Sequence, residues 1–197
     1  MRTFLAIALS PEVTRNIGTI QDRLKKSLTG EVRWVRPEGV HLTLKFFGEI
    51  TPAEAERIGA VVAGPAAAAA PFVLEVRGLG SFPNLNRPRV IWLGLAGETV
   101  ALLSLHRELE RELAAAGFPE EERPFQAHLT LGRVKIPKGI LGLAGAMETE
   151  AAVAAGRIPV NEIALFKSEL TPRGAIYTRF AAFPLRGCCG RDPFFDF

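Results

Sequence analysis

The sequence has few residues of the kinds that build disulfide frameworks and metal sites. Of its 197 residues, two are cysteines and three are histidines. The cysteines, Cys188 and Cys189, are adjacent in sequence. Neighbouring cysteines seldom bond to each other, and two ligands without a third do not make a zinc site. We therefore expect free thiols in a reducing compartment.

Long hydrophobic runs are also missing. No stretch approaches the ~20 consecutive apolar residues of a membrane span, and the first residues lack the flanks of a signal peptide. The hydrophobic content of 48% is ordinary for a globular chain that is long enough to bury a core. We expect a cytoplasmic protein that does not associate with membranes. The net charge of +3 permits an anionic partner but does not require one.

One tetrapeptide occurs twice, as His41-Leu42-Thr43-Leu44 and as His128-Leu129-Thr130-Leu131. The first copy lies among β-forming residues that end at Gly48, which predicts a strand. Strand side chains alternate between faces, so each His and Thr should share one face, ~7 Å apart, with the leucines on the other. Two such strands facing each other would surround one space with two imidazoles and two hydroxyls. This arrangement suits a group with charged oxygens and two reacting ends.

The rest of the chain alternates strand and helix patterns in two comparable halves. Apolar stripes and capping residues predict helices over 11–28 and 98–116, a helix from Thr51 that breaks at Gly64-Pro65, and a weak helix over 139–155. The alanine run at 66–70 is expected to be a helical continuation or a tight connection. Strands are predicted over 3–9, 32–35, 40–48, 72–79, 89–95, 158–168 and 175–183 and at the second tetrapeptide. Because the connections are short, we expect an α+β fold with largely antiparallel strands.

The two tetrapeptides and their surroundings resemble the signatures of the 2H phosphoesterases. Within that superfamily they are most similar to the RNA 2′,3′-cyclic phosphodiesterases, also called 2′-5′ RNA ligases. The resemblance is carried by RWVRPEGVHLTLKFFGE at 33–49, by RPFQAHLTLGR at 123–133 and by a closing hairpin from Phe166 to Tyr177. A single H-x-T is a weak signal, whereas two copies at this separation are specific. Ala127 departs from the family, which often has Pro there, and should affect rigidity more than chemistry.

The resemblance implies a bilobed 2H phosphoesterase fold. Two pseudo-symmetric lobes of mainly antiparallel sheet would carry helices on the outside and enclose a central cleft. One domain would cover 1–185, followed by a tail at 186–197. The implied partner is RNA with a 2′,3′-cyclic phosphate end, single-stranded or tRNA-like, and a monomer is expected. No metal and no other cofactor is expected. The residues agree about metals, because neither motif has an Asp or Glu beside its His.

The chemistry of ring opening needs two forms of histidine. Water attacks the phosphorus in line with the departing ribose oxygen, so one imidazole must be neutral and the other protonated, which a pKa of ~6.5 allows. The resemblance implies that His41 is the donor and His128 the acceptor, whereas the residues alone leave this open. Thr43 and Thr130 would donate to the non-bridging oxygens. The implied product carries a 2′-phosphate, and the reverse reaction explains the ligase name.

Three further residues are candidates for substrate binding. Strand alternation puts Lys45 and Phe47 on the same face as His41, so Lys45 could bind a phosphate and Phe47 could stack on a base. The alternative is that Lys45 is a solvated side chain and Phe47 a core residue. Arg133 has the alternation of the buried leucines, which argues against the cleft. However, Gly132 could introduce a bulge or end the strand, and the family uses an Arg here for the phosphate, so we expect Arg133 in the site.

Two other functions remain possible on the same fold. One is a 2H phosphodiesterase that acts on a nucleotide cyclic phosphate, a tRNA-splicing product or a 2′-5′ linked oligonucleotide. The other is a non-catalytic RNA-binding protein, which the four intact motif residues disfavour. The third histidine, His106, is expected at the edge of a helix stripe with Glu110 as its partner.

Overall fold

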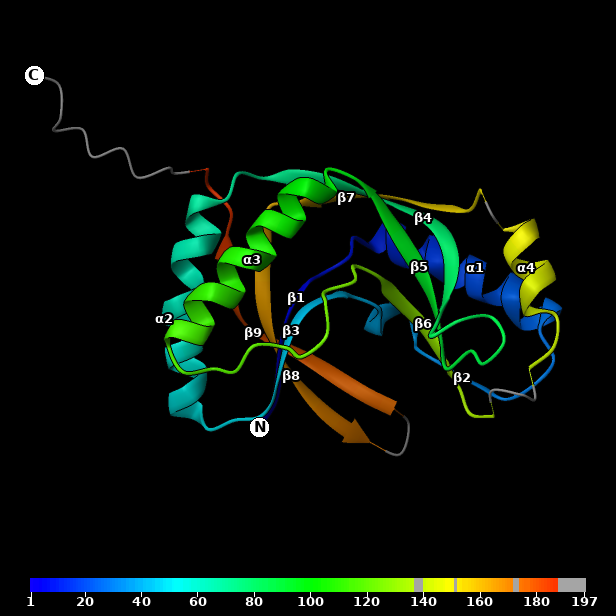
Figure 1. Cartoon of the computed structure of the whole chain (residues 1–197), viewed down its shortest axis with the longest axis horizontal. Coiled ribbons are helices and arrows are strands. Elements are labelled where there is room, and N and C mark those ends of the chain that lie inside the picture. Colours follow the sequence, from blue (N-terminus) through cyan, green and yellow to red (C-terminus); the bar gives the residue numbers. More distant parts are fainter. Residues whose placement is uncertain (137–139, 151, 172–173, 188–197) are drawn as a thin grey trace, which may run out of the picture.

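The computed structural model describes residues 1–136, 140–150, 152–171 and 174–187. Strands and helices alternate along the chain (Figure 1). In chain order, the elements are β1 (Arg2–Ile7), α1 (Pro11–Ser27), β2 (Val32–Trp34), the 3-10 turn η1 (Pro37–Gly39), β3 (Leu42–Glu49), α2 (Pro52–Ala68), β4 (Phe72–Phe82), β5 (Val90–Gly97), α3 (Thr99–Ala115), β6 (Leu129–Val134), α4 (Leu143–Thr149), β7 (Ala154–Val160), β8 (Glu162–Thr171) and β9 (Gly174–Pro184).

The strands form one curved antiparallel sheet in two halves. The order is β7-β4-β5-β6-β3-β1-β8-β9, and β2 pairs with β6 outside this path. The two inner strands, β3 and β6, carry the two tetrapeptides and connect the halves. In Figure 1, α2 and α3 lie beside the half that contains β8 and β9, and α1 and α4 lie beside the other half. The predicted α+β, bilobed architecture is therefore confirmed.

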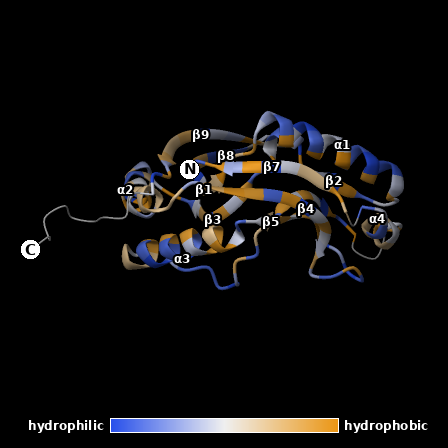
Figure 2. Ribbon diagram, turned by 90° about the horizontal axis from the view of Figure 1, so that it is seen from above, coloured by the Kyte–Doolittle hydropathy of each residue, from blue (hydrophilic) through white to orange (hydrophobic). Residues whose placement is uncertain are grey.

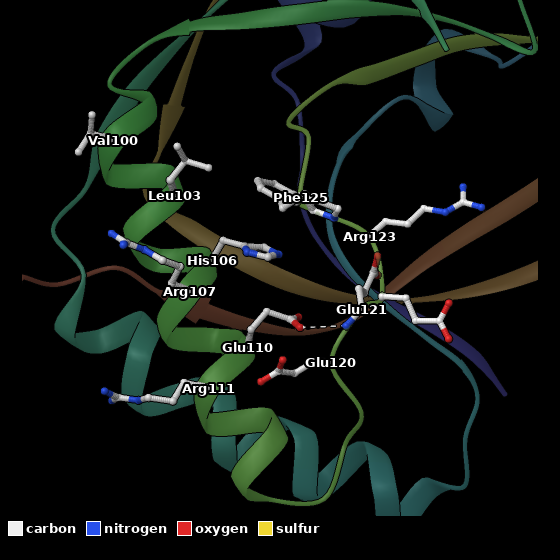
Figure 3. A pocket seen from close by; sticks show the side chains of 12 residues that line it. Val100, Leu103, His106, Arg107, Glu110, Arg111, Glu120, Glu121, Arg123 and Phe125 are labelled. Carbon is white, nitrogen blue, oxygen red and sulfur yellow. Dashed lines mark hydrogen bonds between the residues drawn. The ribbon is translucent and has the colours of Figure 1, made fainter. Parts of the chain in front are cut away.

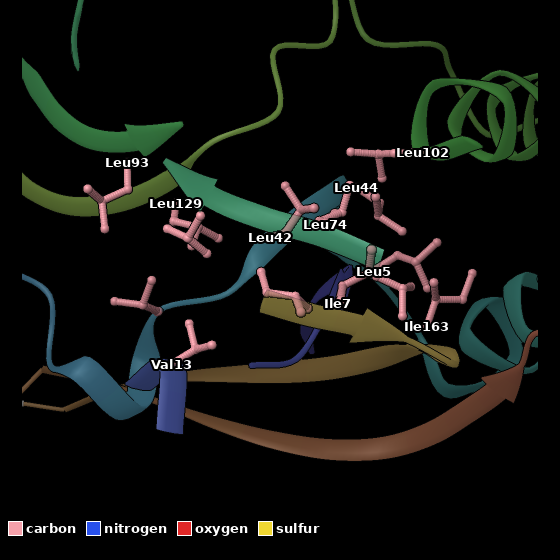
Figure 4. Packing of buried hydrophobic residues seen from close by; sticks show 14 of the residues in the cluster. Leu5, Ile7, Val13, Leu42, Leu44, Leu74, Leu93, Leu102, Leu129 and Ile163 are labelled. Atoms are coloured by element: carbon pink, nitrogen blue, oxygen red, sulfur yellow. The ribbon is translucent and has the colours of Figure 1, made fainter. Parts of the chain in front are cut away.

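Apolar residues on the inner faces of both halves form one core (Figure 4). Helix α1 shows how the sequence places them. Ser10 caps its first turn by accepting from the Val13 N–H at 3.3 Å, Pro11 starts it, and Ile17 and Leu24 are fully buried. Each such burial contributes ~1.5–3 kcal/mol. Figure 2 shows the matching alternation of hydrophobic and hydrophilic residues around the helices.

The expected break in the second helix is wrong, and of the two alternatives for the alanine run the helical continuation is present as far as Ala68. Helix α2 continues through Gly64 and Pro65 to Ala68. Proline removes one donor, but the carbonyl of Pro65 still accepts from the Ala69 N–H at 3.1 Å, and Ala66 is fully buried. The alanines favour helix strongly and pack without side-chain entropy loss, which offsets the missing hydrogen bond.

Two other expected elements have different bounds. The strand predicted over 158–168 is two strands, β7 and β8, separated by Asn161. Because β7 pairs with β4 and β8 with β1, the chain crosses here from one half of the sheet to the other. The helix expected over 139–155 is confined to α4, and residues 139 and 151 lie outside the described residues.

The start of the expected tail is attached to the domain. The Leu185 N–H donates to the Asn161 carbonyl at 2.8 Å, and the Gly187 N–H donates to the Ala69 carbonyl at 2.9 Å. Cys188, Cys189 and the remaining residues to 197 lie outside the described residues. Among the helices of the described ranges, none is both long and apolar enough to cross a membrane.

Candidate active site

The two tetrapeptides meet where the halves of the sheet join. Leu42 of β3 and Leu129 of β6 are directly opposed antiparallel partners, and both side chains are fully buried. In an antiparallel pair with this register, His41 lies opposite Thr130, and Thr43 lies opposite His128. Alternation puts these four side chains on the face opposite the leucines. The structure therefore brings together the four residues that the repeat singled out.

Both histidines are oriented by the same local contact. The Nδ1 atom of His41 lies 2.8 Å from the Gly39 carbonyl oxygen, and that of His128 lies 2.6 Å from the Gln126 carbonyl oxygen. A carbonyl can only accept, so Nδ1 carries the proton in each ring. This leaves Nε2 of both imidazoles available for proton transfer at a substrate.

Aromatic rings surround His41. Its ring stacks on Phe4 with centroids 4.5 Å apart and meets Tyr177 edge-on at 5.0 Å, and Phe166 stacks behind Phe4 at 5.4 Å. Burial lowers the pKa of His41 to about 4, although the hydrogen bond to the Gly39 carbonyl opposes this shift. In the unliganded protein His41 is therefore neutral at pH 7.

The surroundings of His128 combine aromatic rings with a positive charge. Phe82 meets its ring edge-on at 4.9 Å, and Trp92 lies at 6.4 Å. Burial lowers the pKa of His128, the hydrogen bond to the Gln126 carbonyl opposes this, and the charge of Arg133 lowers it further. A neutral His128 is the form that can accept a proton.

The hydroxyls of Thr43 and Thr130 are free to bind a ligand. Both residues are half-buried. Within the described part of the chain, neither hydroxyl has a hydrogen-bond partner. Because they lie on the face of the histidines, they can donate to one group placed between the imidazoles.

A bulge changes the direction of the side chains after Thr43. Leu5 of β1 pairs with Lys45 and Ala6 pairs with Thr43, which leaves Leu44 as an extra residue in β3. Lys45 is consequently 3% exposed, and its ammonium donates to both carboxylate oxygens of Glu110 at 2.8 and 2.9 Å and to the Pro119 carbonyl at 2.9 Å. The expectation that Lys45 shares the face of His41 is wrong, and its three donors are already used.

The same bulge exchanges the expected roles of two phenylalanines. Phe46 is 52% exposed and packs against Phe4, the ring on which His41 stacks, with centroids 5.7 Å apart. Phe47 is half-buried and meets Phe118 edge-on at 6.0 Å. The expected orientation of Phe47 is therefore wrong, because strict alternation does not survive a bulge. Phe46 is therefore the exposed ring that packs on Phe4, the ring between it and His41.

A matching bulge in β6 positions Arg133. Ile91 of β5 pairs with Gly132 and Trp92 pairs with Thr130, so Leu131 is the extra residue. Arg133 is exposed, and its charge acts on His128. The expected bulge near Gly132 is thus present, and Arg133 lies near the second motif. The extra leucine is the fourth residue of the tetrapeptide in both strands.

Comparisons with known proteins agree with this geometry. The model of the family described as LigT like Phosphoesterase matches the chain twice, at residues 7–92 and 93–177. An RNA 2′,3′-cyclic phosphodiesterase of Methanothermobacter thermautotrophicus is 40% identical over 94% of this chain and 99% of its own length. A second relative of that name, from Aeropyrum pernix, is 37% identical over 79% of this chain and 89% of its own.

Solved structures show the same fold. The crystal structure of TT0787 of Thermus thermophilus matches with a TM-score of 0.74 and 31% identity, over 95% of this chain and 99% of that one. Escherichia coli LigT complexed with 3′-AMP matches with a TM-score of 0.72 and 26% identity, over 93% and 97%. The chain belongs to the LigT-like phosphoesterase family.

A separate pocket of about 770 Å³ lies between α3 and the segment that precedes the second motif of this phosphoesterase (Figure 3). It is lined by α3 and by residues 120–125, and its lining includes none of the four motif side chains. His106 stacks on Phe125 there at 3.9 Å, and burial lowers its pKa. Glu110 accepts from the Glu121 N–H at 3.3 Å, shown dashed in Figure 3, and holds Lys45, so the pocket wall is tied to β3.

Several residues of the phosphoesterase site were not anticipated from its sequence. Phe4, Phe82 and Trp92 contact the histidines from strands that hold neither motif, and Tyr177, which ends the hairpin of the family resemblance, contacts His41 edge-on. No local pattern marks such residues, because only the sheet order brings them to the motifs. Among the described residues, no three His, Cys, Asp or Glu side chains come together as metal ligands would.

Proposed function

We propose that this phosphoesterase hydrolyses RNA 2′,3′-cyclic phosphate ends to 2′-phosphate ends without a metal ion. The observation that carries the proposal is the direct pairing of Leu42 with Leu129, which sets two His-Thr pairs around one space. The printed name of the relatives that cover nearly the whole chain, RNA 2′,3′-cyclic phosphodiesterase, supports the substrate class.

Catalysis uses one proton acceptor and one proton donor. Nε2 of His128 takes a proton from water as its oxygen forms a bond to phosphorus. The bond from phosphorus to the ribose O3′ breaks, and Nε2–H of His41 gives its proton to O3′. The product keeps the phosphate on O2′ and has a free 3′-hydroxyl. Proton exchange with solvent restores both rings.

The electrostatics support these roles in different ways. Burial and, to a smaller extent, the charge of Arg133 lower the pKa of His128, which favours the neutral acceptor. His41 is also neutral in the unliganded protein, because burial lowers its pKa to about 4. The negative phosphate raises that pKa on binding, so His41 takes up its proton together with the substrate. Thr43, Thr130 and Arg133 stabilise the charge that grows on the non-bridging oxygens.

The terminal base stacks on Phe46. This ring is exposed and packs on Phe4, on which His41 also stacks, and aromatic stacking is sequence-tolerant. A nucleotide ligand in a LigT-like structure, 3′-AMP in the Escherichia coli protein, supports a mononucleotide-sized end group in such a site. If a 5′-hydroxyl of RNA replaces water as the nucleophile, the same steps give a 2′-5′ linkage.

The deciding experiment is turnover of an oligonucleotide with a 2′,3′-cyclic phosphate end in excess EDTA. We expect full activity with a 2′-phosphate product. Thr43→Val and Thr130→Val should each be slower, because each removes a donor to the phosphate oxygens. Thr19→Val is the matched control, since its hydroxyl bonds only to the Arg15 carbonyl within α1. Activity that is lost in EDTA and restored by a divalent ion would contradict the metal-free mechanism.

A further inference from the structure

The short ladder between β2 and β6 places two arginines opposite each other. Arg33 and Arg133 are direct antiparallel partners, flanked by the pairs Val32–Val134 and Trp34–Gly132. Both arginines are exposed. Opposed side chains have Cβ atoms ~4.5–5.5 Å apart, and like charges in this position are destabilising. Such a pair is tolerated where an anion neutralises it.

The next charged pair on the same ladder is balanced. Two residues along, Lys135 and Glu31 form an ion pair at 3.0 Å, and the Lys135 N–H donates to the Glu31 carbonyl at 2.9 Å. By contrast, neither guanidinium of the arginine pair has an ion-pair or hydrogen-bond partner in the described ranges. Of these two pairs, the one nearer the second motif, Arg33 and Arg133, therefore carries two positive charges that are not neutralised.

The arginine pair lies on the face of the active site. The bulge at Leu131 turns Arg133 to the side of Thr130 and His128, and its charge acts on His128. Directly opposed residues of an antiparallel pair point to the same side, so Arg33 also faces this side. Figure 1 shows β2 next to the end of β6, and β6 is the strand with which β2 pairs. Arg33 thus extends the positive charge one strand away from the histidine.

We propose that Arg33 binds the internal phosphodiester that precedes the terminal nucleotide of the RNA. This inference rests on the proposed function, in which the reacting phosphate is bound by Arg133. A second anion beside the first neutralises both arginines, and a guanidinium matches phosphate oxygens with two parallel donors. The substrate class is then an oligoribonucleotide with at least one internal phosphate, in preference to a cyclic mononucleotide.

Two substrates with the same terminal nucleotide test the proposal. One is 2′,3′-cyclic AMP, which has no internal phosphate, and the other is ApA with a 2′,3′-cyclic phosphate end. For Arg33→Met we expect KM for the dinucleotide to rise by about tenfold to a hundredfold, the usual scale for one charged hydrogen bond. Its kcat, and both constants for cyclic AMP, should stay unchanged. A plot of log KM for the dinucleotide against log salt concentration should be less steep in Arg33→Met than in the wild type. The difference in slope should be about 0.7, the value for one phosphate contact of a single strand.

Lys135→Met is the matched control. It removes one positive charge from the same ladder, but from a residue that is already paired with Glu31, and it should leave the preference for the dinucleotide intact. Equal losses in Lys135→Met and Arg33→Met would mean that only net charge matters, which overturns the proposal. If Arg33→Met raises KM for cyclic AMP as much as for the dinucleotide, Arg33 binds the reacting phosphate instead, and the proposal is overturned. An unchanged dinucleotide KM in Arg33→Met also overturns it.

A binding measurement separates this inference from the proposed function. If the wild-type protein turns over neither substrate, the proposed reaction fails whatever Arg33 does. Affinities for 2′-AMP and for ApA carrying a 2′-phosphate can still be compared by titration calorimetry. A wild-type preference for the dinucleotide that Arg33→Met removes supports the phosphodiester site. No preference, or one that the variant keeps, refutes it.

Discussion

At the scale of single residues, each histidine is subject to opposing effects on its pKa. Burial against aromatic rings lowers the pKa of both His41 and His128, and the hydrogen bonds to the Gly39 and Gln126 carbonyls oppose the shift. The balance leaves His41 with a pKa of about 4. Since the unfolded imidazole titrates at ~6.5, the unfolded chain binds more protons between these values. His41 therefore contributes stability above pH 6.5 that is lost as the pH falls toward 4.

The neighbouring phenylalanines Phe46 and Phe47 give a residue-scale test of the base platform. Phe46→Leu should weaken binding of a cyclic-phosphate oligonucleotide by ~1–3 kcal/mol, because it removes an exposed stacking surface. Its effect on thermal unfolding should be small. Phe47→Leu is the matched control and should instead lower the stability by ~1 kcal/mol, since it loses contact with Phe118.

Calorimetric titrations and thermal melts of the two variants measure both quantities. Weaker binding in Phe47→Leu with unchanged affinity in Phe46→Leu would restore the orientation that strict strand alternation predicts. It would also show that the bulge does not set the binding surface.

At the scale of elements, polar side chains from helices face both motif bulges. The buried Gln21 of α1 donates from Nε2 to the Leu131 carbonyl at 3.0 Å and to the Val35 carbonyl at 2.8 Å. In β3, the carbonyl of the bulge residue Leu44 faces His106 of α3 and opposes the fall in the pKa of that histidine. A bulge interrupts the ladder, so its backbone groups need other partners. In β6, Gln21 supplies such a partner two residues before Arg133.

The tie between β3 and α3 leads to a prediction about Lys45. Lys45→Met should lower the free energy of unfolding by about 3–5 kcal/mol, because Glu110 is left largely buried without its partner. Adding Glu110→Leu should recover part of this loss. Lys25→Met is a control in an exposed ion pair with Asp22 and should cost below ~1 kcal/mol.

Denaturant unfolding and steady-state kinetics together decide this point. A Lys45→Met protein of normal stability but with a raised KM would identify Lys45 as a phosphate ligand after all.

The bulges also mark the limit of what the sequence could predict about the site. The repeated tetrapeptide predicted that His41, Thr43, His128 and Thr130 share a face, because alternation holds over three residues of a strand. It could not place Phe46, since a bulge depends on the register with β1. Gly132 suggested a bulge or a strand end in β6, and only the family resemblance favoured placing Arg133 in the site. Similarly, α2 continues past Pro65 because its alanines favour helix and one face of the helix is buried in the core. The local sequence pattern does not reveal this burial.

At the scale of the whole molecule, the site exists only where the two halves join. The family model matches 7–92 and 93–177 separately, and each match contains one tetrapeptide. The halves are not equivalent at the position five residues after the histidine, which is Phe46 in one and Arg133 in the other. An apolar platform therefore faces a positive charge across the pseudo-symmetric site. Under the proposed function, we expect this asymmetry to orient a nucleotide end with its base toward β3 and its phosphate toward β6.

In the proposed mechanism each half supplies one proton-transfer group, so the two histidines should act as a unit. The rate should rise and then fall with pH, because acid removes the neutral acceptor and alkali removes the protonated donor. The profile of kcat/KM, which reports the free enzyme, should be centred below pH 6.5, because the pKa of both histidines is lowered. In the complex the bound phosphate raises these values, so the kcat profile should lie at higher pH.

Single and double variants test that coupling. His41→Ala should lose the alkaline fall and His128→Ala the acid fall, each with a loss of ~10²–10⁴-fold in rate. The double variant should be little slower than either single one, because neither ring works without the other. If His41→Ala instead loses the acid fall and His128→Ala the alkaline fall, the donor and acceptor roles are reversed but the mechanism is kept. Strictly additive losses, or a double variant with wild-type activity, would show that the two halves do not share one reaction centre.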